Sequence, residues 1–408
     1  MSAQARSAPP ALRHNRDFVL LWAGQAISRL GSQASFVAFP LLVLASTGSP
    51  TKAGIVGFAN GVPALLIYLP AGVLIDRHDR RRILIAASVI GALAMGSLVV
   101  ALGTGTAVFA HIVIVALVEG SVVAVLAMAE QGALPNVVGA GRVSEAVARN
   151  EARSHAAALA GPPLGGVLFA VDRLAPFAAD AASYLCCAVL SRRVRGPLQE
   201  TRAGDEGRDV RREIAEGIRC LWRQPFVRAS AIAVAVGNLV WSGLFIVLVV
   251  RATEGGASAA LVGAMLAVIG AGGLVGALVA PAAARRLPAP TIVLGTFWIQ
   301  ALLLPALMLT RAPPAMGVIV GLGALAAPAW NAVVVGARLS LTPDRLRGRV
   351  NAAARLTSAG MMPFGALGAG LMIDGAGTTV TIGALSVVSA MLALAATASP
   401  ALRRGPGH

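Results

Sequence analysis

Two ionisable residues, Arg29 and Glu119, lie deep inside apolar runs of the sequence and could together bind and release a proton. Arg29 interrupts the run 18–44, and Glu119 interrupts the run 107–129. A charge at the centre of a bilayer costs roughly 2.5 to 3.5 kcal/mol on insertion scales, so residues of this kind mark functional sites. We predict an ion pair between them, direct or water-bridged, that opens when Glu119 binds a proton. A permanent salt bridge joining two helices is the alternative.

The composition and the apolar runs are typical of an all-α polytopic membrane protein. Of the 408 residues, 57% are hydrophobic and 13% are charged, whereas soluble domains carry about 25% charged residues. A transmembrane helix needs roughly 20 mainly apolar residues. By this measure the sequence predicts twelve spans, of which 174–191 is the weakest. They lie near 18–44, 53–75, 83–102, 107–129, 150–171, 174–191, 229–250, 258–281, 290–310, 315–338, 352–373 and 376–397.

The basic residues gather on one side of the predicted spans. The net charge is +16, and 29 of the 34 lysines and arginines fall at the N-terminus, at the C-terminus, in the loops that follow even-numbered spans or at the adjoining helix ends. The opposite side holds only Lys52, Arg173, Arg251 and Arg311. By the positive-inside rule, both termini are expected in the cytoplasm of a multi-pass protein of the cell (inner) membrane. This orientation accounts for the basicity without a nucleic-acid partner.

Internal similarity divides the chain into two halves. The segment "FVLLWAG" at residue 18 resembles "FVRASAI" at 226, and "GRVSEAVARNEA" at 141 resembles "GRVNAAARLTSA" at 348. Two further segment pairs, in the second span and in the loop after it, match at similar offsets. The four offsets agree within four residues, which predicts two pseudo-symmetric six-helix bundles, 1–191 and 229–408. The linker, 192–228, contains apolar residues at helical intervals in "VRREIAEGIRCLW". This helix could lie on anionic lipid or be a solvated linker helix.

The stretch "GVLIDRHDRRRILI", residues 72–85, places an acid and several arginines between two apolar runs. Its pattern resembles the loop between the second and third helices of major facilitator superfamily transporters. The similarity is to the drug:proton antiporter branch, which includes macrolide and siderophore exporters. The matching residues are Gly72, Leu74, Asp76, Arg77, Arg80 and Arg81. We interpret this loop as the conformational switch, because Asp76 could cap the next helix or bind an arginine of the other half.

A second segment, "GPPLGG", is similar to a motif in the fifth helix of the antiporters. It comprises Gly161, Pro162, Gly165 and Gly166 together with Pro163 and Leu164. Glycines four residues apart allow close helix approach, and proline removes a backbone donor. The resemblance implies a leak-preventing hinge between the halves, and close packing alone is the alternative.

In the fold that the resemblance implies, helices 1, 4, 7 and 10 line a central cavity. The polar and aromatic residues on those helices are therefore substrate-cavity candidates: Gln25, Gln33, Asn238, Trp241, Trp330 and Asn331. Sparse amides among apolar groups suit an amphipathic organic molecule, although such amides also join helices by hydrogen bonds. Helix 6 is peripheral in this fold, so Asp180 is expected in a capping or interface position.

These observations predict a secondary active efflux transporter for an amphipathic small molecule, working by alternating access and exchanging it for protons. The sequence contains no phosphate loop, nucleophile elbow, zinc-ligand cluster or dinucleotide fingerprint. We therefore expect no enzymatic activity, no metal and no cofactor, with a proton gradient as the energy source and a monomer as the working unit. A proton-coupled uptake transporter and a non-transporting membrane receptor or accessory protein remain as alternatives.

Overall fold

The computed structural model of the chain describes residues 12–199, 210–342 and 346–405. Some side chains also lie outside the description, namely those of residues 68–77, 140, 210–214, 217, 339, 347–349, 351–352 and 355. The described residues form helices joined by short turns, with no strand among them. The all-α fold class is thereby confirmed.

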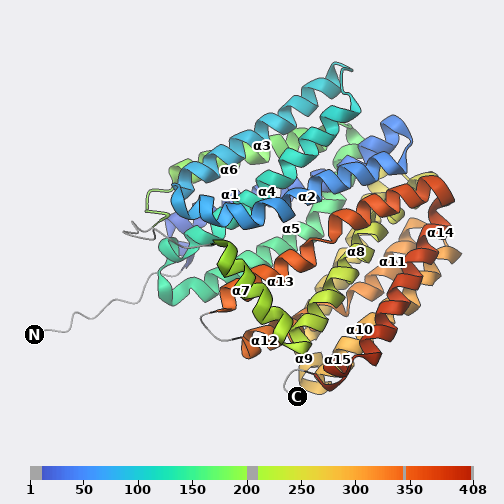
Figure 1. The fold of residues 1–408 in the computed structure, drawn as a ribbon. Helices are drawn as coiled ribbons and strands as arrows, with labels where there is room; N and C mark the ends of the chain where they lie inside the picture. The colour runs from blue at the N-terminus through green and yellow to red at the C-terminus, as the bar shows by residue number, and fades with distance from the viewer. Residues whose placement is uncertain (1–11, 200–209, 343–345, 406–408) are drawn as a thin grey trace, which may run out of the picture.

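The helices follow one another along the chain as shown in Figure 1. The first group is α1 (Arg16–Thr47), α2 (Pro50–Arg77), α3 (Arg80–Gly103), α4 (Phe109–Val138), α5 (Val143–Val171) and α6 (Ala175–Arg193). The linker helix is α7 (Val210–Arg223). The second group is α8 (Pro225–Glu254), α9 (Ala259–Arg286), α10 (Ala289–Leu303), α11 (Pro313–Ala324), α12 (Ala327–Leu341), α13 (Arg347–Ala359), α14 (Met362–Ala398) and α15 (Pro400–Arg404). A 3-10 turn, Leu304–Leu309, extends α10.

Polar residues and glycine in the loops begin and end the apolar helices. The Asn15 side chain accepts a hydrogen bond from the Phe18 backbone N–H at 3.1 Å and caps α1. Gly48 ends the same helix with a φ of 65°, a left-handed conformation that favours glycine. Asp79 accepts from the Arg81 N–H at 2.8 Å and starts α3. The short polar loops are therefore built as helix caps.

Most predicted spans coincide with helices, but two are divided. Within the described residues, nine helices are long and apolar enough to cross a membrane, and the count of twelve stays a prediction. The run 315–338 is split between α11 and α12, with Pro328 in the first turn of α12, where a missing N–H costs nothing. The run 352–373 is divided between α13 and α14 near Gly360. Helix α14 itself changes direction at Gly377, whose φ of 81° is typical of glycine.

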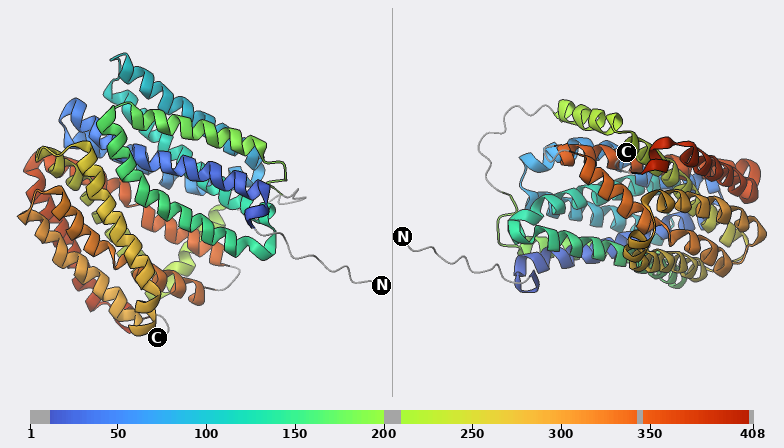
Figure 2. Two further views of the ribbon diagram at one scale, coloured as in Figure 1. Left: turned by 180° about the vertical axis from the view of Figure 1, so that it is seen from behind. Right: turned by 90° about the horizontal axis from the view of Figure 1, so that it is seen from below.

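The helices gather into two groups, as the two sides of the molecule in Figures 1 and 2 show. In the first group α1 packs on α5 and α6, and α4 packs on α2 and α3. In the second group α8 packs on α14, and α9 packs on α11 and α12. The groups meet along two seams, α2 with α14 and α5 with α9. This pairing gives the molecule two helix seams between its halves.

Glycines bring the helices of each seam together at one end of the molecule. This end carries the turns at Gly48, Gly256 and Gly377 and is called the distal end; the opposite end carries Arg16 and Arg404 and is called the terminal end. A Cβ atom built on Gly166 would lie 2.8 Å from the Gly263 Cα, and one built on Gly54 would lie 3.1 Å from the Gly370 Cα. Because such distances leave no room for a side chain, both seams depend on glycine where they close.

A larger side chain at the α5–α9 seam should force the distal end apart. We expect Gly166→Val to lower cross-linking between cysteines introduced at Phe169 and Ala259, which line one cavity across this seam. The measurement uses a short bismaleimide and a background in which Cys186, Cys187 and Cys220 are replaced. Gly295→Val is the control, because no atom lies within 4 Å of a Cβ built on Gly295. Equal cross-linking in both variants would contradict the glycine argument.

The linker helix α7 packs against the second group of helices. Leu221 is buried in a cluster with Val227 of α8 and with Val350, Ala353 and Ala354 of α13. Trp222 on the same helix is about half exposed. Among the described side chains of α7, Leu221 and Ile218 therefore pack on protein, and contact of this helix with lipid stays a prediction.

Candidate functional site

A buried hydrogen-bond network surrounds Glu119 inside the first group of helices. The Tyr184 hydroxyl of α6 lies 2.9 Å from both carboxylate oxygens of Glu119 on α4 and donates to them. The same hydroxyl is 3.0 Å from the Ser32 Oγ on α1. Glu119 is 3% exposed and Tyr184 is fully buried. Gly91 of α3 makes room for the Tyr184 ring, since a Cβ there would lie 3.0 Å from it.

Arg29 is not ion-paired with Glu119 in this structure. Both residues are described, and no nitrogen–oxygen contact within 4.0 Å joins them among the ion pairs of the described residues. The Arg29 side chain is half-buried on α1, and its charge acts on Glu119 from a distance. The direct ion pair expected from the sequence is therefore replaced by the Tyr184 hydrogen bond, and a water-bridged pair stays a prediction.

Asp180 lies buried at the interface between α6 and α1, which is one of the two positions expected for it, a cap being the other. Its side chain is fully buried and accepts hydrogen bonds from the Ser35 Oγ of α1 at 2.7 Å and the Ser183 Oγ at 3.1 Å. A Cβ built on Gly31 would lie 2.6 Å from the Asp180 Oδ1. The interface position holds, because α6 turns this face toward α1 and Gly31 leaves space for the carboxylate beside the α1 backbone.

At the distal end, Asp374 of α14 binds the start of α2. Its Oδ2 accepts from the Ser49 Oγ at 3.0 Å and from the Thr51 backbone N–H at 3.1 Å. The residue lies in the exposed turn before Gly377, outside the predicted spans. Partial burial acts to raise the pKa of Asp374, but the hydrogen bonds from Thr51 and Ser49 outweigh it and hold the pKa below its ordinary value. The α2–α14 seam therefore has a polar latch.

Removing this latch should loosen the α2–α14 seam. At neutral pH we expect Asp374→Asn to raise, by a few-fold, the rate at which an impermeant maleimide labels a cysteine at Ala366, a buried seam residue. The pKa of Asp374 is lowered, so the latch stabilises the closed seam fully at pH values above the ordinary pKa of an aspartate. This stabilisation is lost as the pH falls through the lowered pKa. Because a maleimide reacts with the thiolate, both labelling rates should fall in acid, and the wild type should fall less than Asp374→Asn, so that the two rates converge.

The matched control for this latch is Asp172→Asn. Asp172 also lies in a distal turn, but its carboxylate accepts from the Leu174 N–H of its own turn. Labelling rates that are equal in Asp374→Asn and the wild type at neutral pH would show that the latch does not hold the seam.

The predicted switch loop is only partly described. Gly72, Asp76 and Arg77 belong to α2, and their side chains lie outside the described residues. Arg80 donates to the Gly132 carbonyl of α4 at 2.6 Å and to the Leu198 carbonyl at 3.3 Å. Arg81 donates to the Gly196 carbonyl at 2.7 Å. These contacts join α3 to α4 and to the segment after α6, all within the first half of the chain.

The "GPPLGG" motif lies where α5 meets both α1 and α9. A Cβ on Gly161 would lie 3.2 Å from the Gln33 Cα, and one on Gly165 would lie 2.9 Å from the Ala34 Cα. Gly166 faces α9, as described for the seam. Helix α5 continues through Pro162 and Pro163 from Val143 to Val171. The motif packs three helices closely, and the hinge role predicted for it remains a prediction.

The six substrate-cavity candidates do not line one cavity here. Gln25 is buried and donates to the Cys187 Sγ at 3.6 Å, and Asn238 donates to the Ser358 carbonyl at 2.7 Å. Trp330 packs against Phe297, with ring centroids 4.9 Å apart. Gln33 is half-buried, whereas Trp241 and Asn331 are exposed. Gln25 and Asn238 thus make the helix-joining hydrogen bonds that were the alternative for such residues.

A buried ion pair links α4 to α5 and was missed from the sequence. Arg153 donates from both terminal nitrogens to the two Glu130 oxygens at 2.7 Å each. The side chains are 7% exposed, and Asn150 donates to Glu130 at 3.1 Å. The signal was present in the sequence, since Glu130 directly follows one predicted span and Arg153 lies just inside another. Bidentate geometry of this kind fixes two helices relative to each other.

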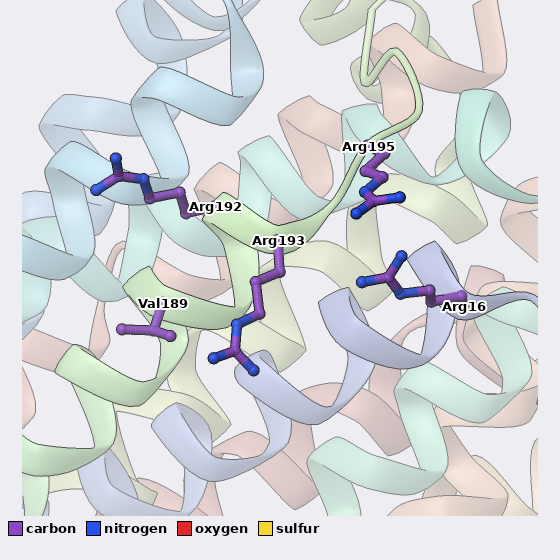
Figure 3. Close-up of a pocket in the computed structure, with 5 residues that line it drawn as sticks. All are labelled: Arg16, Val189, Arg192, Arg193 and Arg195. Atoms are coloured by element: carbon purple, nitrogen blue, oxygen red, sulfur yellow. The ribbon is translucent and has the colours of Figure 1, made fainter.

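Two cavities lie away from these residues. One, of about 490 Å³ at the terminal end, is lined by Val189 and four arginines; Figure 3 shows Arg16 and Arg195 pointing toward each other across it. The other, of about 380 Å³, lies between the halves at the distal end and is mostly apolar, with Glu254 as its one charged residue. The remaining residues that line it are Leu41, Leu44, Ala45, Gly48, Pro50, Phe169, Val250, Thr253, Ala257 and Ala259.

Comparison with known proteins settles the family. A family model described as transmembrane secretion effector matches residues 7–405, nearly the whole chain. The chain belongs to this family of major facilitator transporters. This membership confirms that it is a membrane transporter and not an enzyme.

Relatives of this transporter cover almost its full length. It is 29% identical over 398 residues to the multidrug efflux pump Tap of Mycolicibacterium fortuitum, covering 91% of this chain and 93% of the pump. It is also 29% identical over 417 residues to the Tap pump of Mycobacterium tuberculosis (strain ATCC 25618 / H37Rv), covering 95% and 94%. A shorter match, 34% over 73 residues, is to macrolide efflux protein A of Streptococcus pyogenes, covering 18% of each chain.

Solved structures share the fold of this transporter. A bacterial homologue of the human lysosomal transporter Spinster, in an inward-facing and unoccupied conformation, superposes with a TM-score of 0.69 at 15% identity and 96% coverage of both chains. A bacterial homologue of the iron transporter ferroportin, in an inward-facing state, gives a TM-score of 0.68 at 15% identity. It covers 94% of this chain and the whole of the other. The major facilitator fold expected from the sequence is confirmed.

Proposed function

We propose that this transporter exports an amphipathic small organic molecule in exchange for protons. The observation that carries the proposal is Glu119, a carboxyl group buried beside a tyrosine hydroxyl and without an ion-paired cation among the described residues. A carboxyl group in such a site can be neutral in one conformation and ionised in another, since a change of hydration or of distance to Arg29 alters the balance. The relatives named multidrug efflux pumps support export as the direction.

The orientation follows from the distribution of basic residues. The terminal end carries most arginines, including Arg16, Arg193 and Arg404, and is placed in the cytoplasm by the positive-inside rule. The distal end then faces outward, where glycine contacts close both seams. The arrangement corresponds to a state closed to the outside, and the inward-facing solved structures of the same fold support this assignment. Proton release by Glu119 would occur in this state.

The character of the distal cavity supports an amphipathic cargo. Its walls come from the ends of α1, α5 and α8 and the start of α9, so it lies between the halves. Apolar walls with a single carboxylate suit an organic molecule that carries a positive or polar group. Under the proposed orientation this cavity lies on the exit side of the transporter.

The remaining architecture follows the same proposal. Twelve spans form two six-helix bundles, 1–191 and 229–408, joined by the segment 192–228. The protein works as a monomer in the inner membrane with both termini in the cytoplasm. In the outward-facing state, Asp76 at the cytoplasmic end of α2 would bind across to the other half, so the loop from Gly72 to Arg81 acts as the conformational switch.

The test is transport by the purified protein in proteoliposomes with an imposed pH gradient. Ethidium and a macrolide serve as probes, because one is an amphipathic cation and the other a larger amphipathic molecule. We expect flux of at least one probe against its gradient, abolished by a protonophore. Flux that ignores both the gradient and the protonophore would exclude proton exchange.

A further inference from the structure

We propose that Asp180 is a second proton-binding residue, and that Asp180 and Glu119 form one buried carboxyl pair that holds a single proton in this conformation. The inference rests on the proposed proton exchange and names the residue that acts with Glu119. It assigns a role in transport to α6, which the sequence had placed at the periphery.

The two carboxyl groups are bound by matching rows of hydroxyls. On α1, Ser32 and Ser35 lie one turn apart on one face; on α6, Asp180 and Tyr184 lie one turn apart on the facing side. Ser35 donates to Asp180 at 2.7 Å, while the Ser32 hydroxyl meets the Tyr184 hydroxyl at 3.0 Å. Tyr184 in turn donates to Glu119. Three helices thus supply two polar clusters, one around Asp180 and one around Glu119, that lie one helix turn apart and form a polar layer inside an apolar bundle.

The charges around this layer do not balance if both acids are ionised. Facing it are Arg29 from α1, Glu119 from α4, and Tyr184 and Cys187 from α6, and the residues that α3 turns toward Tyr184 and Cys187 are the uncharged Gly91 and Ser88. No ion pair within 4.0 Å reaches either carboxyl among the described residues.

Ionising both carboxyl groups costs much more free energy than ionising one. Arg29 can offset one negative charge at most, and an unpaired second charge inside the bilayer is expensive. One bound proton leaves a single carboxylate opposite Arg29 and removes the repulsion between the two acids. Asp180 lies one helix turn from Tyr184, which binds Glu119, so the two acids are close enough for the charge on one to affect the other. We therefore treat their protons as belonging to the pair and not to either residue alone. The pair binds a second proton when it faces outward and releases it to the cytoplasm, so that one proton remains in this conformation.

Space beside Gly31 and a hydrogen bond from Ser183 hold the Asp180 carboxyl group in this layer. Gly31 leaves the space that the Asp180 Oδ1 occupies, because a Cβ there would lie 2.6 Å from that oxygen. Ser183, on the same helix, holds the other side of the carboxyl group at 3.1 Å. An acid that served only as a cap would need neither the glycine nor the buried hydroxyls.

The test is an infrared titration of the purified full-length protein, following the C=O band of protonated carboxyl groups. The wild type should show two steps from the buried pair. Asp180→Asn and Glu119→Gln should each leave one step, with a midpoint that differs from both wild-type midpoints, because each variant removes the interaction within the pair. A remaining step that coincides with a wild-type midpoint, or two steps in Asp180→Asn, would overturn the proposal.

A second variant covers the case in which Asp180→Asn fails to fold. Ser35→Ala keeps both carboxyl groups but deletes one hydrogen bond to Asp180, so at least one midpoint should move. Unchanged midpoints in Ser35→Ala would also overturn the proposal. Glu145→Gln is the control, because Glu145 is exposed and should leave both buried steps in place.

Transport separates this inference from the proposed function. In proteoliposomes, ethidium efflux driven by a pH gradient should fall about tenfold or more in Asp180→Asn. If wild-type flux ignores the gradient, the proposed exchange fails while the titration still decides whether the pair exists. If the wild type responds to the gradient and Asp180→Asn transports equally well, the pair is not used in transport and the inference fails alone.

Discussion

Replacing Glu119 by glutamine should abolish transport driven by the pH gradient while the protein stays folded. Glutamine has nearly the same shape and can still accept a hydrogen bond from the Tyr184 hydroxyl, which lies 2.9 Å from the carboxylate oxygens. It cannot bind or release a proton at any pH of interest. We expect the initial rate of gradient-driven ethidium efflux in proteoliposomes to fall at least about tenfold, with little change in thermal stability.

Exchange measurements identify which step is lost. If Glu119 couples the two fluxes, exchange of ethidium for ethidium across the membrane needs no net proton movement and should survive in Glu119→Gln. Glu145→Gln is the matched control, since Glu145 is an exposed acid paired only with arginines on the α5 surface. Gradient-driven efflux at the wild-type rate by correctly folded Glu119→Gln would rule out the coupling role.

Replacing Arg153 by leucine should strongly destabilise the protein. The substitution leaves Glu130 buried with its bidentate partner removed, and breaking a buried pair by removing one member typically costs about 3 to 5 kcal/mol. We expect a clear drop in the apparent melting temperature of the purified protein in detergent. Glu130→Gln should be milder, because the amide can still accept a hydrogen bond from Arg153.

A variant of an exposed ion pair is the control for this stability measurement, and a double variant removes both members of the buried pair. Arg149→Leu removes an exposed contact to Glu145 at 3.0 Å and should cost about 0 to 1 kcal/mol. Combining Arg153→Leu with Glu130→Leu should recover much of the lost stability, because no buried charge is then left without a partner. A melting temperature for Arg153→Leu equal to that of Arg149→Leu would show that the buried pair has no special weight.

The sequence predicted the helices better than their breaks. Long apolar runs such as 18–44 and 258–281 became α1 and α9, because hydropathy alone requires a helix in a membrane. The division between α11 and α12 was not predicted, because hydropathy does not register a proline at a helix start. A break between the predicted spans 352–373 and 376–397 was expected, and the structure has it at Gly377, where non-helical backbone separates the two parts of α14.

The candidate site was only partly predictable, because the sequence does not show which face of a helix points into the bundle. Glu119 was identified from depth alone, which sequence position reports directly. Asp180 was set aside because the resemblance implies a peripheral helix 6. A peripheral helix still turns one face inward, and which face does so depends on packing against α1. Tyr184 was missed for the same reason. Its hydroxyl becomes a partner of Glu119 only when α4 and α6 are brought together.

The carboxylate of Asp374 makes the two seams chemically unequal. At the α2–α14 seam an acid-sensitive hydrogen bond to Ser49 and Thr51 adds to the glycine contact, whereas Gly166 meets Gly263 backbone to backbone at the α5–α9 seam. If the outer side becomes acidic, only the first seam loses a bond. The two bundles would then separate first at the α2–α14 seam and pivot about α5 and α9. Because the pKa of Asp374 lies below the ordinary value of an aspartate, this opening needs a pH below that value.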